Sequence, residues 1–184
     1  MVDKQQSLFE IQELSFDGNQ QKIKNTKSHD VATKIVWQLY VDGASRGNPG
    51  PSGAGMYILK NGELFKKKGS YLGKRTNNEA EYLALLIGIA LVKKEMNKHD
   101  TLHIFSDSQL LINQMNGVYR VKKAELLVLY TIGKKETSDL SVVFQHIMRE
   151  YNTHADQAAN DGIDKKGSLP LAFLHMMRLH NVSV

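Results

Sequence analysis

Residues 35–62, IVWQLYVDGASRGNPGPSGAGMYILKNG, decide the fold of this chain. The first eight residues alternate between two faces that are both largely apolar, which is typical of a central strand covered on both sides of its sheet. The apolar stretches GAGMYILK and ELFKKKGSYLG then flank Asn61-Gly62, a strong signal for a two-residue hairpin. We therefore expect the first three strands to form an antiparallel meander.

A helix is predicted from Thr76 to about Asn97. Thr76 and Glu79 have the spacing of a capping box, and the interior LALLIGIALV is apolar on nearly every side. The short apolar strand TLHIF follows. These patterns place a buried helix between the third strand and the fourth.

The rest of the chain adds three helices and one strand. Helices are expected at residues 107–116, 122–137 and 153–166, with the strand LSVVFQHI between the last two. A strand that leads through a helix to another strand favours parallel, right-handed crossovers. The order predicts an α/β protein with a mixed five-stranded sheet and helices on both faces.

The 184 residues divide into an N-terminal extension or linker at 1–34, one domain at 35–166, and a C-terminal tail at 167–184. The apolar tail has two open interpretations: it packs back on the domain, or it contacts a partner. The longest apolar stretch, 83–92, is too short to span a bilayer. The polar, acid-containing N-terminus is unlike a secretory signal. We expect a cytoplasmic monomer without membrane association.

Bulk composition limits the chemistry further. The chain has no cysteine, which excludes disulfides and thiolate metal sites. Its formal net charge is +5, which suits either a polyanionic partner or simply a solvated basic surface.

Four acidic residues stand in distinct local frames. They are Asp42 in YVDGASRGNPG, Glu81 in TNNEAEY, Asp107 in IFSDSQLLI and Asp156 in NTHADQAAN. Asp42 and Asp107 follow strands expected to be parallel, and ligands of such sheets lie at the carboxyl ends of these strands. Carboxylate oxygens suit magnesium, and two such ions can clamp the attacking and leaving oxygens of a phosphodiester. The pattern predicts a cage for divalent metal.

Each acid also has a purely structural explanation when it is taken alone. Asp42 fits an Asp–Gly turn, and Asp107 fits a helix N-cap. Glu81 and Asp156 lie near helix starts, where the helix dipole favours negative charge. Glu81 is flanked by residues suited to a core, however, so its carboxylate needs a partner that a metal would supply.

The four frames together resemble type 1 ribonuclease H over about residues 36–163. The resemblance implies a ribonuclease H-like fold that hydrolyses the RNA strand of RNA/DNA hybrids as an endonuclease. It further implies two Mg²⁺ ions, with Mn²⁺ as a substitute, and products with 5′-phosphate and 3′-hydroxyl ends. Carried over by position, Asp42, Glu81, Asp107 and Asp156 are both the catalytic and the metal-binding residues.

The same resemblance implies a set of contacts to the nucleic acid. The residues in the matching positions are Asn48, Asn77, Asn78 and Gln109. These are short neutral groups suited to sugar and phosphate, so sequence preference should be weak. Some members also carry an extra basic helix with tryptophans. Residues 117–137 of this chain are expected to form one helix and contain no tryptophan, so we expect that helix to be missing; the lysines at 122, 123, 134 and 135 offer weaker electrostatic binding.

The chain departs from many members before the fourth acid, where they carry a catalytic histidine on a flexible loop. His146 is expected on a strand, and the loop at 149–151 is short. The assisting role could instead fall to Arg149, Glu150 or His154. The other alternative is that no side chain of this chain takes that role.

Three rival functions remain open. A non-catalytic module that binds hybrid or duplex RNA would be expected to have lost at least one acid, yet all four are present. A different nuclease of the wider superfamily would not be expected to carry the Asn-Pro-Gly-Pro and Thr-Asn-Asn frames together. A domain whose acids are all structural predicts no stabilisation by magnesium.

Overall fold

The computed structural model describes residues 34–183, so the predicted N-terminal extension lies almost wholly outside the described residues. Its centre is one five-stranded sheet with the spatial order β3-β2-β1-β4-β5. The strands are β1 (Val36–Ser45), β2 (Gly50–Lys60), β3 (Glu63–Arg75), β4 (Thr101–Ser106) and β5 (Ser141–His146).

Strand pairing confirms the predicted mixed sheet. β1, β2 and β3 pair antiparallel, whereas β4 pairs parallel with both β1 and β5. Asn61 and Gly62 have φ angles of 52° and 81°, the left-handed conformation that a tight hairpin requires. β3 lies at one edge of the sheet, and its residues 63–67, which include Lys66 and Lys67, are exposed, while Lys68 is half-buried.

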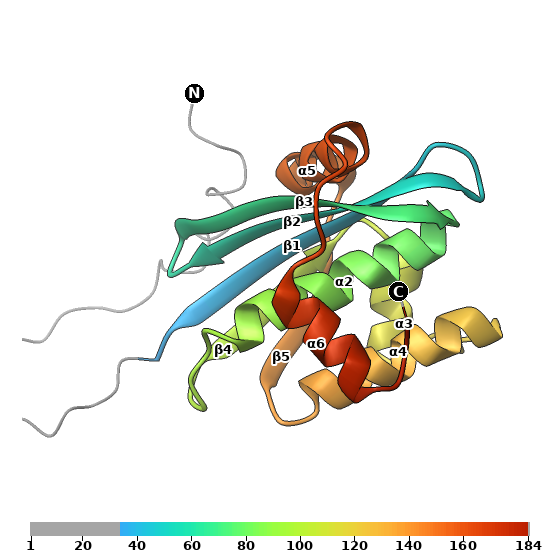
Figure 1. The fold of residues 1–184 in the computed structure, drawn as a ribbon. Helices are drawn as coiled ribbons and strands as arrows, with labels where there is room; N and C mark the ends of the chain where they lie inside the picture. The colour runs from blue at the N-terminus through green and yellow to red at the C-terminus, as the bar shows by residue number, and fades with distance from the viewer. Residues whose placement is uncertain (1–33, 184) are drawn as a thin grey trace, which may run out of the picture. The chain divides into compact units, whose positions relative to one another are not determined.

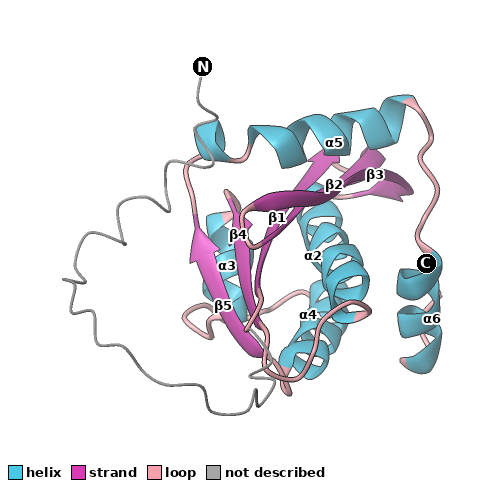
Figure 2. Cartoon of the chain, turned by 90° about the vertical axis from the view of Figure 1, so that its left-hand side faces the viewer, coloured by secondary structure: helices cyan, strands magenta, loops and turns pink. Residues whose placement is uncertain are grey.

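Helices cover both faces of the sheet (Figures 1 and 2). They are α2 (Asn77–Lys93), α3 (Gln109–Met115), α4 (Ala124–Thr137), α5 (Thr153–Asp164) and α6 (Leu171–Leu179), with a short 3₁₀ helix η1 (Arg149–Tyr151) before α5. α5 packs on β1, β2 and β3 from one side, and α2 packs on β1 and β2 from the other, with α4 against α2. Among the described residues, no helix is long and apolar enough to cross a membrane.

The predicted capping box begins α2. Thr76 Oγ1 accepts a hydrogen bond from the Glu79 backbone N–H, and Glu79 Oε2 accepts one from the Thr76 N–H. The helix ends at Lys93, four residues before the predicted end. The turn that follows is fixed by Asp100, whose Oδ2 accepts hydrogen bonds from the Asn97 N–H and the Trp37 indole.

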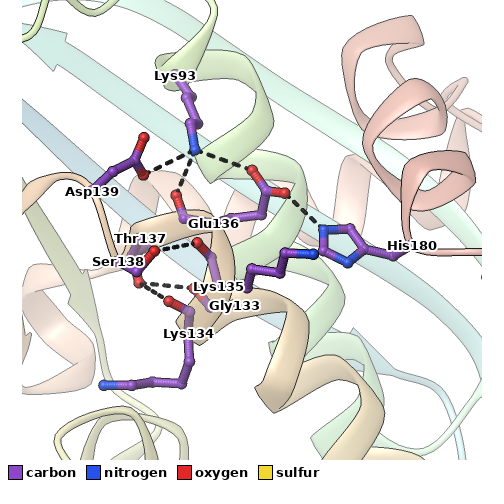
Figure 3. A network of polar contacts seen from close by, with 9 residues as sticks. All are labelled: Lys93, Gly133, Lys134, Lys135, Glu136, Thr137, Ser138, Asp139 and His180. Carbon is purple, nitrogen blue, oxygen red and sulfur yellow. Dashed lines mark hydrogen bonds and ion pairs between the residues drawn. The ribbon is translucent and has the colours of Figure 1, made fainter.

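The C-terminal tail packs back on the domain, which was one of its two open interpretations. α6 contacts α2 and buries Phe173, Met176 and Met177. Figure 3 shows the polar contacts beside this packing: His180 Nε2 lies 2.7 Å from Glu136 Oε1. Lys93 Nζ lies 3.3 Å from Glu136 Oε2, so one carboxylate joins α6, α4 and α2.

Replacing Phe173 with alanine tests how much α6 contributes to stability. Phe173 is 0% exposed, so Phe173→Ala should lower the free energy of unfolding by about 3–5 kcal/mol. Leu171 on the same helix is 84% exposed, and Leu171→Ala should change it by no more than about 0.5 kcal/mol. Urea unfolding of both variants measures the difference, and equal effects would show that α6 is not docked as described.

Candidate active site

Two of the four acids lie just past the point where the parallel pairing of β1 and β4 ends. Tyr40 of β1 is paired with Phe105 of β4, and Asp42 and Asp107 each follow two residues later. Asp42 lies within β1 and Asp107 directly follows β4, so the register places the two acids at the same level of the sheet. This is the edge at which the sequence predicted the site.

A glycine brings the third acid beside the first. Gly43 follows Asp42 on β1, and a Cβ added to it would overlap the backbone of Ala80 and Glu81 on α2. Only glycine permits this approach of helix to strand. Asp42 and Glu81 are each 7% exposed, so their carboxylates meet in a region largely shielded from water.

The fourth acid is positioned by the packing of α5. A Cβ on Gly55 of β2 would overlap the backbone carbonyl of Ala155, so α5 lies directly on the strand. Asp156 follows Ala155 in the first turn of this helix, with its side chain one third exposed. The helix start therefore holds Asp156 at the rim of the cluster.

Electrostatic coupling shows that the four carboxylates form one group. Burial, and after it the charges of Asp107 and Asp156, raise the pKa of Asp42 to about 7. The pKa of Glu81 is raised well above its usual value, mainly by burial and next by the charges of Asp42 and Asp107. Glu81 Oε2 is buried with no hydrogen-bond partner. The negative charge of this site is thus incompletely compensated.

Two side chains compensate part of this charge, and both come from the short segment before α5. Arg149 Nη2 lies 3.0 Å from Asp156 Oδ1, and this guanidinium opposes the rise in the pKa of Asp42 and Glu81. Asn152 Nδ2 donates a hydrogen bond of 2.7 Å to Asp107 Oδ1. The hydrogen-bonding role of Asn152 was not predicted from the sequence.

The structural explanation of Asp107 as an N-cap is excluded. The cap of α3 is Ser108, whose Oγ accepts a hydrogen bond from the Leu111 N–H, so this helix begins two residues later than predicted. Only Asp107 was considered as the cap from the sequence, although its neighbour Ser108 is also a residue type favoured at this position. The carboxylate of Asp107 therefore does not cap α3, and its charge acts on Asp42 and Glu81 of the acidic cluster.

The donor chemistry of the cluster fits a divalent cation. All its charged ligand atoms are carboxylate oxygens, and an unpaired buried oxygen on Glu81 is a group that a cation would satisfy. Within residues 34–183, however, no three acidic or histidine side chains are already gathered as a ready-made metal site. Arg149 and Asn152 hold two of the carboxylates instead, so a cation would have to draw the acids together.

The predicted nucleic-acid contacts lie in loops and helix starts. Asn48 Oδ1 accepts a hydrogen bond of 3.1 Å from the Asn77 N–H, which joins the glycine-rich loop to the start of α2. Asn77 is exposed and Asn78 is half-buried. Gln109 is exposed at the start of α3, two residues after Asp107. The structure therefore joins Asn48 to Asn77 directly and leaves the amide of Gln109 at the surface.

Of the four candidates for an assisting side chain, Arg149 contacts a carboxylate of the cluster. His146 is the last residue of β5, as predicted, and its Nε2 lies 3.2 Å from the backbone oxygen of Asp107. The His154 ring packs on Tyr57 with a centroid distance of 4.5 Å. Glu150 is exposed in η1.

Comparison with known proteins identifies the family to which this chain belongs. Residues 40–162 match the family model described as "Reverse transcriptase-like". LC11-RNase H1, solved in complex with an RNA/DNA hybrid, is 35% identical and superposes with a TM-score of 0.66 over 72% of this chain and 98% of that one. The chain belongs to the type 1 ribonuclease H family.

Other members of the family agree in fold. RNase H1 of Halobacterium salinarum gives a TM-score of 0.67 at 29% identity, over 71% of this chain and 98% of that one. A Mycobacterium tuberculosis protein named as bifunctional is 35% identical over 134 residues, which are 71% of this chain. The chain covers only 36% of the length of that relative.

The raised pKa of Asp42 makes a prediction about stability without metal. Asp42 has a pKa of about 7 when folded and about 3.9 when unfolded, so the folded state binds more protons between these values. Stability in EDTA should therefore fall as the pH rises from about 4 to about 7, and the loss should level off above that. Asp42→Asn should remove much of this loss, on the order of 2 kcal/mol at pH 8.

Urea unfolding at pH 5 and pH 8 measures the effect. Asp164→Asn is the control, because this exposed acid is paired with Arg46 and its pKa is lowered rather than raised. An Asp42→Asn variant with the same pH dependence as the unaltered protein would contradict the coupling described for the cluster.

Proposed function

We propose that this protein is an endonuclease that hydrolyses the RNA strand of RNA/DNA hybrids. The observation that carries the proposal is the acidic cluster, in which four carboxylates from β1, α2, α5 and the end of β4 interact while one buried oxygen lacks a partner. The similarity to LC11-RNase H1, whose structure holds a hybrid, supports the choice of substrate.

The proposed cofactor is a pair of Mg²⁺ ions held by Asp42, Glu81, Asp107 and Asp156, with Mn²⁺ as a substitute. Bound there, the ions would promote ionisation of the attacking water and stabilise the leaving 3′ oxygen, giving 5′-phosphate and 3′-hydroxyl ends. Burial of Asp42 and Glu81 makes their negative charge costly without a cation. The cluster is therefore suited to bind metal strongly once its carboxylates are ionised.

Asn48, Asn77, Asn78 and Gln109 are proposed to contact the hybrid. Amide groups of this kind bind sugar and phosphate, and a contact to the 2′-hydroxyl distinguishes RNA from DNA. The hydrogen bond between Asn48 and Asn77 fixes the relative position of two of the contact segments. We expect weak dependence on base sequence for this reason.

Basic residues between α3 and α4 extend the proposed nucleic-acid surface. Lys122 and Lys123 are exposed in this connection. The connection is held from beneath by Gln114, whose buried amide accepts a hydrogen bond from the Tyr82 hydroxyl and donates one to the Arg120 carbonyl. Lysines on a fixed backbone would attract the phosphates of the hybrid, and this attraction should weaken with added salt.

A non-catalytic hybrid-binding module is the second candidate. The observation that favours it is the absence, among the described residues, of three ligands already gathered for a metal. Retention of all four acids, with their charges coupled, favours the enzyme instead.

A cleavage assay separates the two candidates. We expect internal cuts in the RNA strand of an end-labelled RNA/DNA hybrid, but none in single-stranded RNA, duplex RNA or duplex DNA, and loss of cutting in EDTA. Asp107→Asn should lower cleavage roughly a thousandfold or more. This variant keeps an acceptor for Asn152 and removes one repelling charge, so it should fold at least as stably without metal.

Asp139→Asn serves as the control, because Asp139 is an exposed acid on another part of the molecule, paired with Lys93. It should retain full cleavage. Hybrid binding without cleavage in either Mg²⁺ or Mn²⁺ would establish the binding module. Cleavage retained by Asp107→Asn would remove Asp107 from the catalytic residues.

Arg149 provides a separate prediction about metal demand. Its guanidinium pairs with Asp156 and occupies the position of a compensating cation. Removing a positive charge beside a cation site strengthens cation binding, so Arg149→Gln should lower the Mg²⁺ concentration for half-maximal cleavage by about threefold or more.

The control is Arg178→Gln, which removes an exposed arginine from α6. A magnesium titration of cleavage at fixed ionic strength compares the variants. A higher magnesium requirement in Arg149→Gln would show that this arginine assists metal binding rather than competing with it.

A further inference from the structure

Asn152 is buried at the junction of η1 and α5, and its side chain reaches the acidic cluster. Its exposed fraction is 0%. Nδ2 donates one hydrogen bond of 2.9 Å to the Val41 carbonyl and another of 2.7 Å to Asp107 Oδ1. Val41 immediately precedes Asp42 on β1, and Asp107 directly follows β4, so a single amide group connects β1 and the end of β4 with the start of α5.

The position of Asn152 in the chain makes this use of its side chain unusual. It is the N-cap of α5, and its backbone carbonyl accepts hydrogen bonds from the Ala155 and Asp156 N–H groups. Asparagine is favoured at such positions because its side chain caps the helix, yet here the side chain makes no capping hydrogen bond. The amide is directed to the cluster instead.

The chemistry of the surrounding atoms fixes the orientation of the amide. Both groups that face Nδ2 are oxygen acceptors, so a rotated amide would place oxygen against oxygen. In the observed orientation Oδ1 is buried without a hydrogen-bond partner, which is an unfavourable arrangement for a polar atom. A side chain needed only to fill space would not require this arrangement.

We propose that Asn152 is a positioning residue that orients the Asp107 carboxylate for cation binding. The hydrogen bond to Oδ1 restricts rotation of the carboxylate and leaves Oδ2 as the ligand atom. The second hydrogen bond, to Val41, sets this orientation relative to Asp42. The purpose assigned to the carboxylate rests on the proposed function, whereas the orientation itself rests on the hydrogen bonds.

Substitution of Asn152 by serine and by alanine tests the proposal. Asn152→Ser retains one donor and Asn152→Ala retains none, so the effects should increase in that order. Partners that orient metal ligands typically contribute a factor of about 10–100 in affinity or activity. We expect Asn152→Ala to weaken Mn²⁺ binding, measured by isothermal titration calorimetry, and to lower kcat by about tenfold or more, with KM for the hybrid unchanged.

Thr137→Val is the matched control for lost stability. Thr137 is buried in α4, a helix that carries none of the four acids, and its hydroxyl donates to the Gly133 carbonyl at 2.8 Å. This variant should unfold at a lower temperature, as the Asn152 variants do, while Mn²⁺ affinity and kcat remain unchanged. Circular dichroism establishes the folded fraction of each variant before the other measurements.

The measurements distinguish this proposal from the proposed function. If the unaltered protein binds Mn²⁺ but cleaves no hybrid, the function is wrong, and a weaker Mn²⁺ affinity in folded Asn152→Ser still supports the positioning role. If folded Asn152→Ser and Asn152→Ala both keep the Mn²⁺ affinity and kcat of the unaltered protein, the positioning role is overturned. Should Asn152→Ala not fold, Asn152→Ser alone decides.

Discussion

Repulsion between carboxylates that are shielded from water is the constraint on which the arrangement of this site depends. Asp42 and Glu81 are nearly buried, and the charges of neighbouring acids raise the pKa of both. A protein does not gain stability from such a group in the absence of a counter-charge. The surrounding structure must therefore hold the acids together through contacts that are independent of their charge.

Close packing between backbone segments supplies those contacts. Gly43 admits α2 against β1, and Gly55 admits α5 against β2. Because β1 lies between β2 and β4 and carries Asp42, both helices are fixed relative to the same strand. Packing of this kind is insensitive to pH and salt, so the backbone around the carboxylates can stay in place whether or not they are ionised.

Local patterns in the sequence predicted most of the fold. The apolar alternation before Asp42, the Asn61-Gly62 turn and the capping box at Thr76 each act within a few residues, and each was confirmed. The four acids were singled out by their frames, and the structure brings them into electrostatic contact. The resemblance to the family, rather than the residue pattern alone, selected the substrate.

What the sequence did not predict depends on contacts between distant residues. The hydrogen bond from Asn152 to the Val41 carbonyl joins residues 111 positions apart, and that from Asn152 to Asp107 joins residues 45 apart. No local spacing encodes either pair. The docking of α6 on α2 was left open for the same reason, since its apolar side chains indicate burial without indicating the surface that they cover.

The exposed part of β3 affects the behaviour of the protein in concentrated solution. An edge strand offers unpaired backbone groups to other chains, and here Leu64 and Phe65 are 59% and 37% exposed on it. The three lysines that follow Phe65 place like charges along the same edge, so two copies that approach edge to edge repel each other. β3 is therefore guarded against aggregation by its own sequence.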